Sequence, residues 1–309
     1  MITALSLSPA VDKIYFIDGF ETGKLYRVRN IVKSAGGKGI NVARVCSILG
    51  EKVNLVGFKA GETGEWLESQ LKRMGVNTCF IEVEGESRTN INIIDNVKNL
   101  ETEVLEIGPT IRREDIESFM DEFEKVLKDT AVLVCSGGLP EGIPVNFYRI
   151  LIEKAKFYGT KTILDSSGEM LSEGIKAAPY MVKPNLRELG VYAGKKLDNI
   201  SDIIEACKSI INAGVEIVVT SMGAQGALLV SKDEIMRAKV PDIEVVNTIG
   251  SGDSTVAGCA AGIIRGYSLE KTLRLGMACA VANTQFKEIG YISMELVDKF
   301  FNEILVERL

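Results

Sequence analysis

A Gly-Ser-Gly turn followed by an acidic residue is the strongest chemical signal in the chain. A β-branched run leads into Gly250, Ser251 and Gly252. Small residues that favour a helix follow Asp253. Backbone amides exposed at such a helix start form an anion hole suited to phosphate oxygens, and the glycines let a ligand approach closely. Asp253 would then lie beside a transferring phosphoryl group, although an ordinary helix start with an acidic first turn explains this motif alone equally well.

The position of Asp253 has a cost for base catalysis. A helix N-terminus lowers the pKa of a carboxylate and so weakens it as a base. Phosphoryl transfer tolerates this, because its loose transition state needs positioning and charge stabilisation more than early proton removal. Thr255 replaces the third glycine of a G-x-G-x-x-G dinucleotide fingerprint, which argues against an NAD-linked dehydrogenase.

A second glycine cluster occupies residues 35–43, between a predicted strand and a predicted helix. Gly36 and Gly37 could expose backbone to a polyhydroxy ligand, Lys38 adds a cation, and the Asn41 amide both donates and accepts hydrogen bonds. The chain contains no Walker pattern G-x-x-x-x-G-K-[ST]. A tight turn that caps a helix is the equal alternative for this cluster by itself.

Weaker patterns add ligands for a nucleotide and a metal. Asn185 and Glu188 could hold magnesium through oxygen atoms or waters, and Lys183 could meet a phosphate. A capped helix start is the commoner meaning of this pattern. Residues 221–226 form a strand-end loop whose glycines could follow the phosphates of a nucleotide, and a plain hairpin turn competes with that interpretation.

Two further residues suggest a substrate with hydroxyl and phosphate groups. Asp12 follows the first predicted strand and could accept hydrogen bonds from sugar hydroxyls, but aspartate after a proline-containing turn is ordinary. Arg88 could make a bidentate contact to a phosphate already present on the substrate. A solvated arginine is the alternative for Arg88 without further context.

Composition excludes several classes of chemistry. The 309 residues include no histidine, which removes Ser-His-Asp and Cys-His catalysis and every histidine-ligated metal site. A general base must therefore be Asp, Glu, Lys, Cys or Tyr. The net charge of −6, with dispersed basic residues, argues against a nucleic-acid partner.

The first residues and the cysteines predict a cytoplasmic protein. Residues 1–20 have no basic region before an apolar run, and no segment reaches the roughly 18 apolar residues that span a bilayer, so no membrane partner is expected. The six cysteines are scattered and form no Cys-x-x-Cys. We expect buried, reduced thiols.

Hydrophobic periodicity predicts an α/β fold. Strands are expected at residues 2–7, 53–57, 132–135, 162–165 and 217–221, and helices near 39–49, 64–74, 112–128, 145–158 and 201–213. Strands separated by helices pair in parallel, so the central sheet should be mostly parallel and flanked by helices on both faces. From about residue 252 the pattern becomes almost entirely helical.

Two stretches interrupt this alternation. Residues 13–33 and 85–107 read as alternating strands, for example at 25–32 and 89–95. We expect them to form a small β-lid over the carboxyl edge of the main sheet, where open α/β folds bind ligands. The core domain, which binds nucleotide and sugar, would then comprise residues 1–12, 34–84 and 108–309.

Together these patterns resemble the ribokinase-like carbohydrate kinases of the PfkB type, from the first strand to the last helices. The resemblance rests on Gly-Gly-Lys-Gly-Ile-Asn at 36–41, Ser-Arg-Thr-Asn at 87–90, Thr-Glu-Val-Leu-Glu-Ile-Gly-Pro at 102–109 and Gly-Ser-Gly-Asp-Ser-Thr-Val-Ala-Gly at 250–258. Within the family the likeness is greatest to bacterial tagatose-6-phosphate kinases and 1-phosphofructokinases. It implies a ribokinase-like fold and transfer of phosphate from ATP, with Mg2+, to a ketohexose monophosphate.

The resemblance also implies roles for individual residues. It makes Asp253 the base and the 250–252 turn the anion hole, and it places Asp12, Gly37 and Asn41 on sugar hydroxyls. The substrate phosphate would meet Lys38, Arg88 and Arg27. Mg-ATP would be served by Lys183, Asn185, Glu188, Ser221, Gly223 and Gly226, with Asn283 near the adenine.

The sequence also departs from the family pattern. Gly138 stands at a substrate-side position where relatives commonly show a serine, and Tyr26 stands where an asparagine often precedes the lid arginine. The identity of the sugar therefore stays open between tagatose 6-phosphate and fructose 1-phosphate. A kinase of an unphosphorylated sugar or nucleoside and a non-catalytic sugar-binding relative are the alternatives. A homodimer joined through the lids is expected by analogy.

Overall fold

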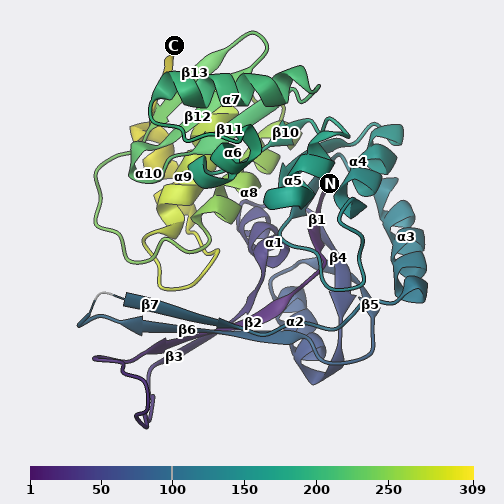
Figure 1. Ribbon diagram of the computed structural model, residues 1–309, viewed down its shortest axis with the longest axis vertical. Coiled ribbons are helices and arrows are strands. Elements are labelled where there is room, and N and C mark those ends of the chain that lie inside the picture. The colour runs from purple at the N-terminus through teal and green to yellow at the C-terminus, as the bar shows by residue number, and fades with distance from the viewer. Residues whose placement is uncertain (99) are drawn as a thin grey trace.

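The main body is a ten-stranded sheet in the computed structural model, which describes residues 1–98 and 100–309 (Figure 1). Its strands, in spatial order, are β14 (Leu305–Arg308), β13 (Ile235–Lys239), β12 (Ala227–Ser231), β11 (Ile217–Ser221), β10 (Met181–Val182), β9 (Lys161–Asp165), β8 (Val132–Ser136), β1 (Ile2–Ser6), β4 (Val53–Lys59) and β5 (Asn77–Glu82). From β5 to β11 neighbouring strands are parallel, and β12, β13 and β14 continue the sheet antiparallel. The predicted mostly parallel sheet is confirmed.

Helices cover both faces of this sheet (Figure 1). One face carries α1 (Lys38–Ile48), α2 (Gly61–Arg73), α8 (Ser251–Ile264), α9 (Leu269–Asn283) and α10 (Met294–Glu303). The other face carries α3 (Arg113–Leu127), α4 (Phe147–Phe157), α5 (Gly168–Ile175), α6 (Leu186–Ala193) and α7 (Ile200–Asn212). The ten elements predicted from periodicity are all present, because these long runs bury their apolar faces against the sheet.

The hydrophobic core is split into two clusters by the sheet. In β8, Val132 and Val134 contribute to one cluster, whereas Leu133 and Cys135 contribute to the other. Side chains alternate across a strand, so a strand buried on both faces must be apolar at every position. This requirement explains why the central strands read as continuous hydrophobic runs.

A second, four-stranded sheet extends from one side of the body (Figure 1). Its order is β3 (Ile31–Gly36), β2 (Ala10–Phe16), β6 (Arg88–Asp95) and β7 (Leu100–Leu105), which we call the small sheet. The predicted strand at 89–95 is confirmed by β6. The strand predicted at 25–32 is wrong over most of its length, because regular pairing starts only at Ile31. Residue 99, within the predicted lid segment 85–107, lies outside the described residues.

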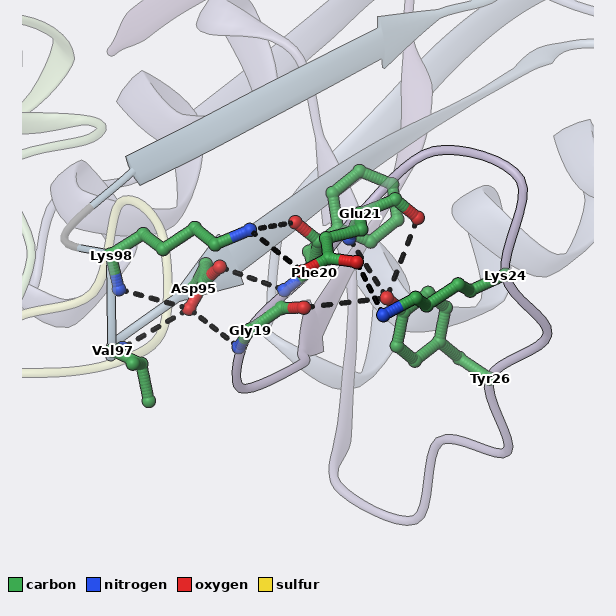
Figure 2. A network of polar contacts seen from close by, with 8 residues as sticks. All are labelled: Gly19, Phe20, Glu21, Lys24, Tyr26, Asp95, Val97 and Lys98. Atoms are coloured by element: carbon green, nitrogen blue, oxygen red, sulfur yellow. Dashed lines mark hydrogen bonds and ion pairs between the residues drawn. The ribbon is translucent and has the colours of Figure 1, made fainter.

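The tip of the small sheet is held by one carboxylate (Figure 2). Asp95 accepts hydrogen bonds from the backbone amides of Gly19 and Phe20 at 2.8 Å, and from those of Val97 and Lys98 at 3.1 Å. The Tyr26 hydroxyl lies in the same network and accepts from an amide at 2.8 Å. These contacts join the β2–β3 connection to the β6–β7 connection. The segment at 25–32 is thus organised by side-chain and turn contacts rather than by strand pairing.

The last part of the chain is helical up to α10, as predicted, and then adds one strand. β14 pairs antiparallel with β13 at the edge of the main sheet. Its side chains are mostly exposed, so it lacks the buried alternation that marks an internal strand.

Two expectations about the chain as a whole concern thiols and membranes. All six cysteines are free, and five are buried, while Cys79 is partly exposed. Among the described residues, no helix has the length and apolar character required to cross a bilayer.

Candidate active site

The chain segments singled out from sequence meet at one polar cavity. A hollow of about 520 Å³ lies at the carboxyl edge of the main sheet, next to the small sheet. Its lining is Asp12, Gly37, Lys38, Asn41, Arg88, Asn90, Asn92, Glu103, Leu105, Asp165, Lys183, Asn185, Glu188, Ser221, Ile249, Gly250, Gly252, Asp253 and Ile289. The segments at 12, 37–41 and 250–253 therefore surround the same point in space.

Asp253 lies in the first turn of α8, as the sequence predicted, and its side chain is almost fully buried. Nδ2 of Asn41 donates to Oδ2 of Asp253 at 2.8 Å. This contact joins the start of α1 to the start of α8, two helices that are far apart in the sequence. The carboxylate is thereby held at one wall of the polar cavity.

The pKa of Asp253 runs against the sequence prediction. Burial from water raises the pKa to about 6, and the Asp165 charge adds to this, while Lys38, the Asn41 hydrogen bond and Lys183 act in the opposite direction. The expectation that this pKa would be lowered is wrong in direction, because dehydration of the carboxylate outweighs the contributions of Lys38, Asn41 and Lys183. A carboxylate with a pKa near 6 is a better proton acceptor than an ordinary aspartate.

The Gly-Ser-Gly turn forms the N-terminus of α8. Gly250 is the N-cap in the left-handed region, with φ of 83°. A side chain there would overlap the backbone of Gly290, so only glycine fits. The first amides of a helix have no acceptor within the helix, which leaves those of Gly252 and Asp253 able to meet an anion.

Two lysines of the cavity share one buried carboxylate. Oδ2 of Asp165 lies 3.2 Å from Nζ of Lys38, and Oδ1 lies 3.2 Å from Nζ of Lys183. Burial alone would raise the pKa of Asp165, but the two ammonium groups hold it below its ordinary value. Asp165 also raises the pKa of Lys38. The structure thus places both predicted cations beside the site and fixes them through a residue that the sequence analysis missed.

Asp12 and Arg88 occupy neighbouring strands of the small sheet. Asp12 follows the first strand, as predicted, and lies in β2 of the small sheet. Asn90 donates to Oδ1 of Asp12 at 2.8 Å, and burial raises the pKa of the carboxyl in spite of this bond. A side chain at position 36 would overlap the Asp12 carboxylate, so Gly36 gives Asp12 its room.

The Arg88 guanidinium is half-buried and points along the same wall. Its Nη2 donates to the backbone oxygen of Ser8 at 3.2 Å. Its Nε is buried without a hydrogen-bond partner in the described part of the chain. A buried donor without an acceptor is costly. The Arg88 residue lines the polar cavity, so its guanidinium adds positive charge there.

A second cavity of about 600 Å³ adjoins the first and is mostly apolar. It is lined by Ser221, Gly223, Ala224, Gly226, Val240, Pro241, Asp242, Ile243, Val245, Thr248, Ser251, Gly252, Thr255, Met277, Ala280, Val281 and Thr284. Ser221 and Gly252 line both cavities. The predicted loop residues Gly223 and Gly226 therefore lie in this second cavity, beside the short 3-10 helix Gly223–Gln225.

Asn283 lies behind this second cavity rather than on its wall. Its side chain is fully buried, and Nδ2 donates to the Ile249 backbone oxygen at 2.9 Å and to Oγ of Ser251 at 3.3 Å. Its amide supports the loop that leads into α8, and its expected place near an adenine stays a prediction.

Asn185 and Glu188 form a capping box at the start of α6. Oδ1 of Asn185 accepts from the Glu188 amide and Oε2 of Glu188 accepts from the Asn185 amide, both at 2.9 Å. Each oxygen has a further lone pair, and both residues line the polar cavity. No cluster of three acidic or thiol ligands occurs among residues 1–98 and 100–309. This donor set fits Mg2+ that keeps waters and phosphate ligands.

Three predicted substrate residues, Gly36, Arg27 and Gly138, do not line the polar cavity. Gly36 lies against the Asp12 carboxylate. Arg27 is exposed on the β2–β3 connection, and Gly138 is exposed after β8. Neither lines the hollow in this single chain. Among residues that sequence reasoning missed, Asp165 carries a usable signal, since it ends a predicted strand at the ligand-binding edge. Asn90 carries one as well, because it ends the Ser-Arg-Thr-Asn motif at 87–90 that supports the family resemblance.

Fold and site define a phosphotransferase of the mixed α/β class, with a buried carboxylate and free amides at a helix start beside a nucleotide-sized cavity. Comparison with protein families gives the same class, because residues 5–294 match the model of the pfkB family carbohydrate kinases. The chain belongs to the pfkB family of carbohydrate kinases, which makes it an ATP-dependent sugar kinase.

Individual relatives agree with this assignment. The chain is 37% identical to tagatose-6-phosphate kinase from Staphylococcus epidermidis, with 99% of each chain covered, and 34% identical to 1-phosphofructokinase from Bacillus subtilis, with both chains covered completely. A solved structure of phosphofructokinase-2 from Escherichia coli in complex with fructose-6-phosphate matches with a TM-score of 0.89 and 28% identity, covering 98% of both chains. The predicted family and fold class are confirmed.

Proposed function

We propose that this chain transfers the γ-phosphate of ATP to a primary hydroxyl of a ketohexose monophosphate and yields the 1,6-bisphosphate. Tagatose 6-phosphate and fructose 1-phosphate are the two candidate acceptors, in keeping with the names of the relatives. One observation carries the proposal: Asp253, the amides at the start of α8 and the cations Arg88 and Lys38 all face one cavity.

Asp253 acts as the proton acceptor in this proposal. The oxygen of the acceptor hydroxyl bonds to the γ-phosphorus as the bond between that phosphorus and the ADP oxygen breaks. The hydroxyl proton passes to Asp253, whose pKa of about 6 leaves it ionised near neutral pH and still basic enough to accept. The amides of Gly252 and Asp253 stabilise the charge on the transferring group.

The polar cavity divides into groups for the sugar and groups for its phosphate. Asp12 accepts hydrogen bonds from sugar hydroxyls, and the Asn41 amide can accept or donate them. The backbone at Gly37 allows the sugar to approach closely. Arg88 binds the substrate phosphate, since it lines this cavity with a guanidinium whose N–H groups can donate to phosphate oxygens. Lys38 is half-exposed beside its Asp165 partner and adds positive charge to the same region.

The nucleotide occupies the apolar cavity in this proposal. Its base packs on Val245, Met277 and Val281, and its phosphates reach the polar cavity past Ser221 and Gly252, which line both hollows. Asn185 and Glu188 would hold Mg2+ through waters, and Lys183 would meet a phosphate. Mg2+ supplies neutralisation of the charge on the β- and γ-phosphates.

The small sheet acts as a lid and as the contact between two copies of the chain. The face turned away from the polar cavity carries exposed apolar side chains, among them Ile31, Leu100 and Val104. Patches of this kind on one sheet mark interaction surfaces. Arg27 is exposed on the β2–β3 connection, so in such an assembly it would be able to reach a substrate phosphate.

An assay of ADP release across sugars and sugar monophosphates tests the substrate class. We expect turnover with a ketohexose monophosphate and little with neutral sugars. The variant Asp253→Asn should bind both substrates and lose at least about 1,000-fold in kcat, because a neutral amide cannot accept the proton. Near-normal turnover in this variant would remove Asp253 from its role.

A further inference from the structure

Arg44 is a buried cation behind the active site. It lies on α1, only 5% exposed, and its guanidinium contacts three separate parts of the chain. Nη1 donates to Oδ1 of Asn41 at 3.2 Å and to the backbone oxygen of Ile289 at 2.6 Å. Nη2 donates to the backbone oxygen of Ala35 in β3. One side chain thus joins α1, the end of the small sheet and the segment that follows α9.

The contact with Asn41 decides which way that amide faces. A guanidinium only donates hydrogen bonds, so the Asn41 atom beside Arg44 must be the acceptor Oδ1. Nδ2 is then on the opposite side, where it donates to Oδ2 of Asp253 at 2.8 Å. Gly290 packs directly against Asn41, since even a Cβ there would overlap its side chain.

Amide direction matters because Asp253 changes its protonation state in the proposed reaction. If the Asn41 amide turned over, its oxygen would accept a hydrogen bond from protonated Asp253 and stabilise the spent form of the base. With Nδ2 fixed toward Asp253, the hydrogen bond favours the ionised, active form. Arg44 makes no direct hydrogen bond or ion pair with the Asp253 carboxylate among the described residues. Its hydrogen-bonded connection to Asp253 runs through Asn41.

The positive charge of Arg44, like its hydrogen bond to Asn41, favours the ionised form of Asp253. Arg44 faces two carboxylates, Asp12 and Asp253. Asp253 in turn faces Lys38, Lys183 and the like charge of Asp165. Burial lowers the pKa of Arg44 to about 10, with both carboxylates opposing the shift, so the group remains a cation at neutral pH.

We propose that Arg44 is a positioning residue that keeps the Asn41 amide directed as a donor at Asp253 and ties this pair to β3 and the Ile289 segment. This inference rests on the proposed function, in which Asp253 is the base. Arg44 does not touch substrate. It sets the pH range in which the base is active, and it links the end of the small sheet to that base.

The pH profile of kcat/KM tests the proposal, measured for wild type, Arg44→Lys and Arg44→Met. In wild type the acid limb should follow Asp253, near pH 6. Arg44→Met removes charge and donors, so the acid limb should move up by about one pH unit, with most activity recovered at alkaline pH. Arg44→Lys keeps the charge but loses the forked geometry, and a smaller shift in the same direction is expected.

Arg265→Met is the matched control. Arg265 is also a partly buried arginine, and it donates to the Leu49 backbone oxygen and the Glu51 carboxylate, both at 2.7 Å, away from the two cavities. It should lower thermal stability and leave the acid limb in place. An unmoved acid limb in Arg44→Met, or in Arg44→Lys should the methionine variant not fold, would overturn the proposal. That result would leave Asp253 as the base, whereas active Asp253→Asn would refute the proposed function itself.

Discussion

The two cavities of the site are built on opposite physical principles. The polar cavity is walled by buried charges and amides, among them Asp253, Asp165 and Lys183. The adjoining apolar cavity is walled mainly by side chains such as Val245, Met277 and Val281. They meet at Ser221 and Gly252. In the proposed function, this boundary separates the polar cavity, where charge develops during phosphate transfer, from the apolar cavity, where the nucleotide base binds.

The two cavities differ in how many kinds of side chain each position of their walls can tolerate. Buried charges are costly unless each has a partner with good geometry, so the polar half tolerates few alternatives. An apolar wall gains free energy in proportion to the area it covers, and many side chains of suitable size serve. Substitutions should therefore have steep effects on the polar side and graded effects on the apolar side.

The largest effect is expected from Asp165→Asn. This change leaves the ammonium groups of Lys38 and Lys183 without their shared carboxylate, and breaking a buried pair costs about 3–5 kcal/mol. Chemical denaturation should show this loss in the free energy of unfolding, and turnover should fall with it. The control Glu173→Gln removes a more exposed carboxylate that also meets two cations, and its effect on the free energy of unfolding should be much smaller. Equal losses in both variants would contradict the distinction.

Arg88→Ala tests the sugar-phosphate side of the polar cavity. Removing a charge-assisted contact to phosphate should raise KM for the phosphorylated sugar about 100-fold and leave KM for ATP unchanged. Arg113→Ala, at an arginine that is 93% exposed on α3, should change neither constant. Unchanged KM in Arg88→Ala would favour a kinase of an unphosphorylated acceptor.

The polar half was also the half that sequence could predict. Gly36, Asn41 and Asp253 occur in short motifs whose residue types are demanded by one chemistry, so they could be recognised in order along the chain. The apolar cavity is assembled from ordinary hydrophobic residues of α9 and the 240–248 segment, which carry no local mark of function.

The strand prediction at 25–32 and the pKa prediction for Asp253 failed because contacts between residues far apart in the sequence determine both. The core strands were readable because burial on both faces dictates their composition. The segment at 25–32 instead depends on a tip held by Asp95, which comes from a distant strand. The pKa of Asp253 likewise depends on how deeply the fold buries it, which a local motif cannot reveal.

Burial of the ionised Asp253 carboxylate should lower the free energy of unfolding. The pH dependence of stability is therefore a third test of the polar cavity. Its folded pKa of about 6 exceeds the ordinary value of 3.8, so the folded state binds the proton more tightly than the unfolded state. The associated stability is present below about pH 4 and is lost as pH rises through about 6. Asp253→Asn should therefore be more stable than wild type by about 3 kcal/mol at pH 8, with little difference at pH 4. Urea denaturation at both pH values checks this, and a pH-independent difference would contradict it.

Val245→Asp probes the apolar half, where the smallest effect is expected. Val245 lies on the wall of that cavity and is 49% exposed, so the fold should accept a polar side chain there. A carboxylate would reduce apolar contact with a bound base and repel the nucleotide phosphates, which should raise KM for ATP about 10-fold and leave KM for the sugar phosphate unchanged. Val191→Asp, at a valine that is 64% exposed on α6, is the matched control and should leave both constants as they are. If Val245→Asp raised KM for the sugar phosphate as well, the two cavities would act as one continuous site, and the separation of charge chemistry from base binding would have to be abandoned.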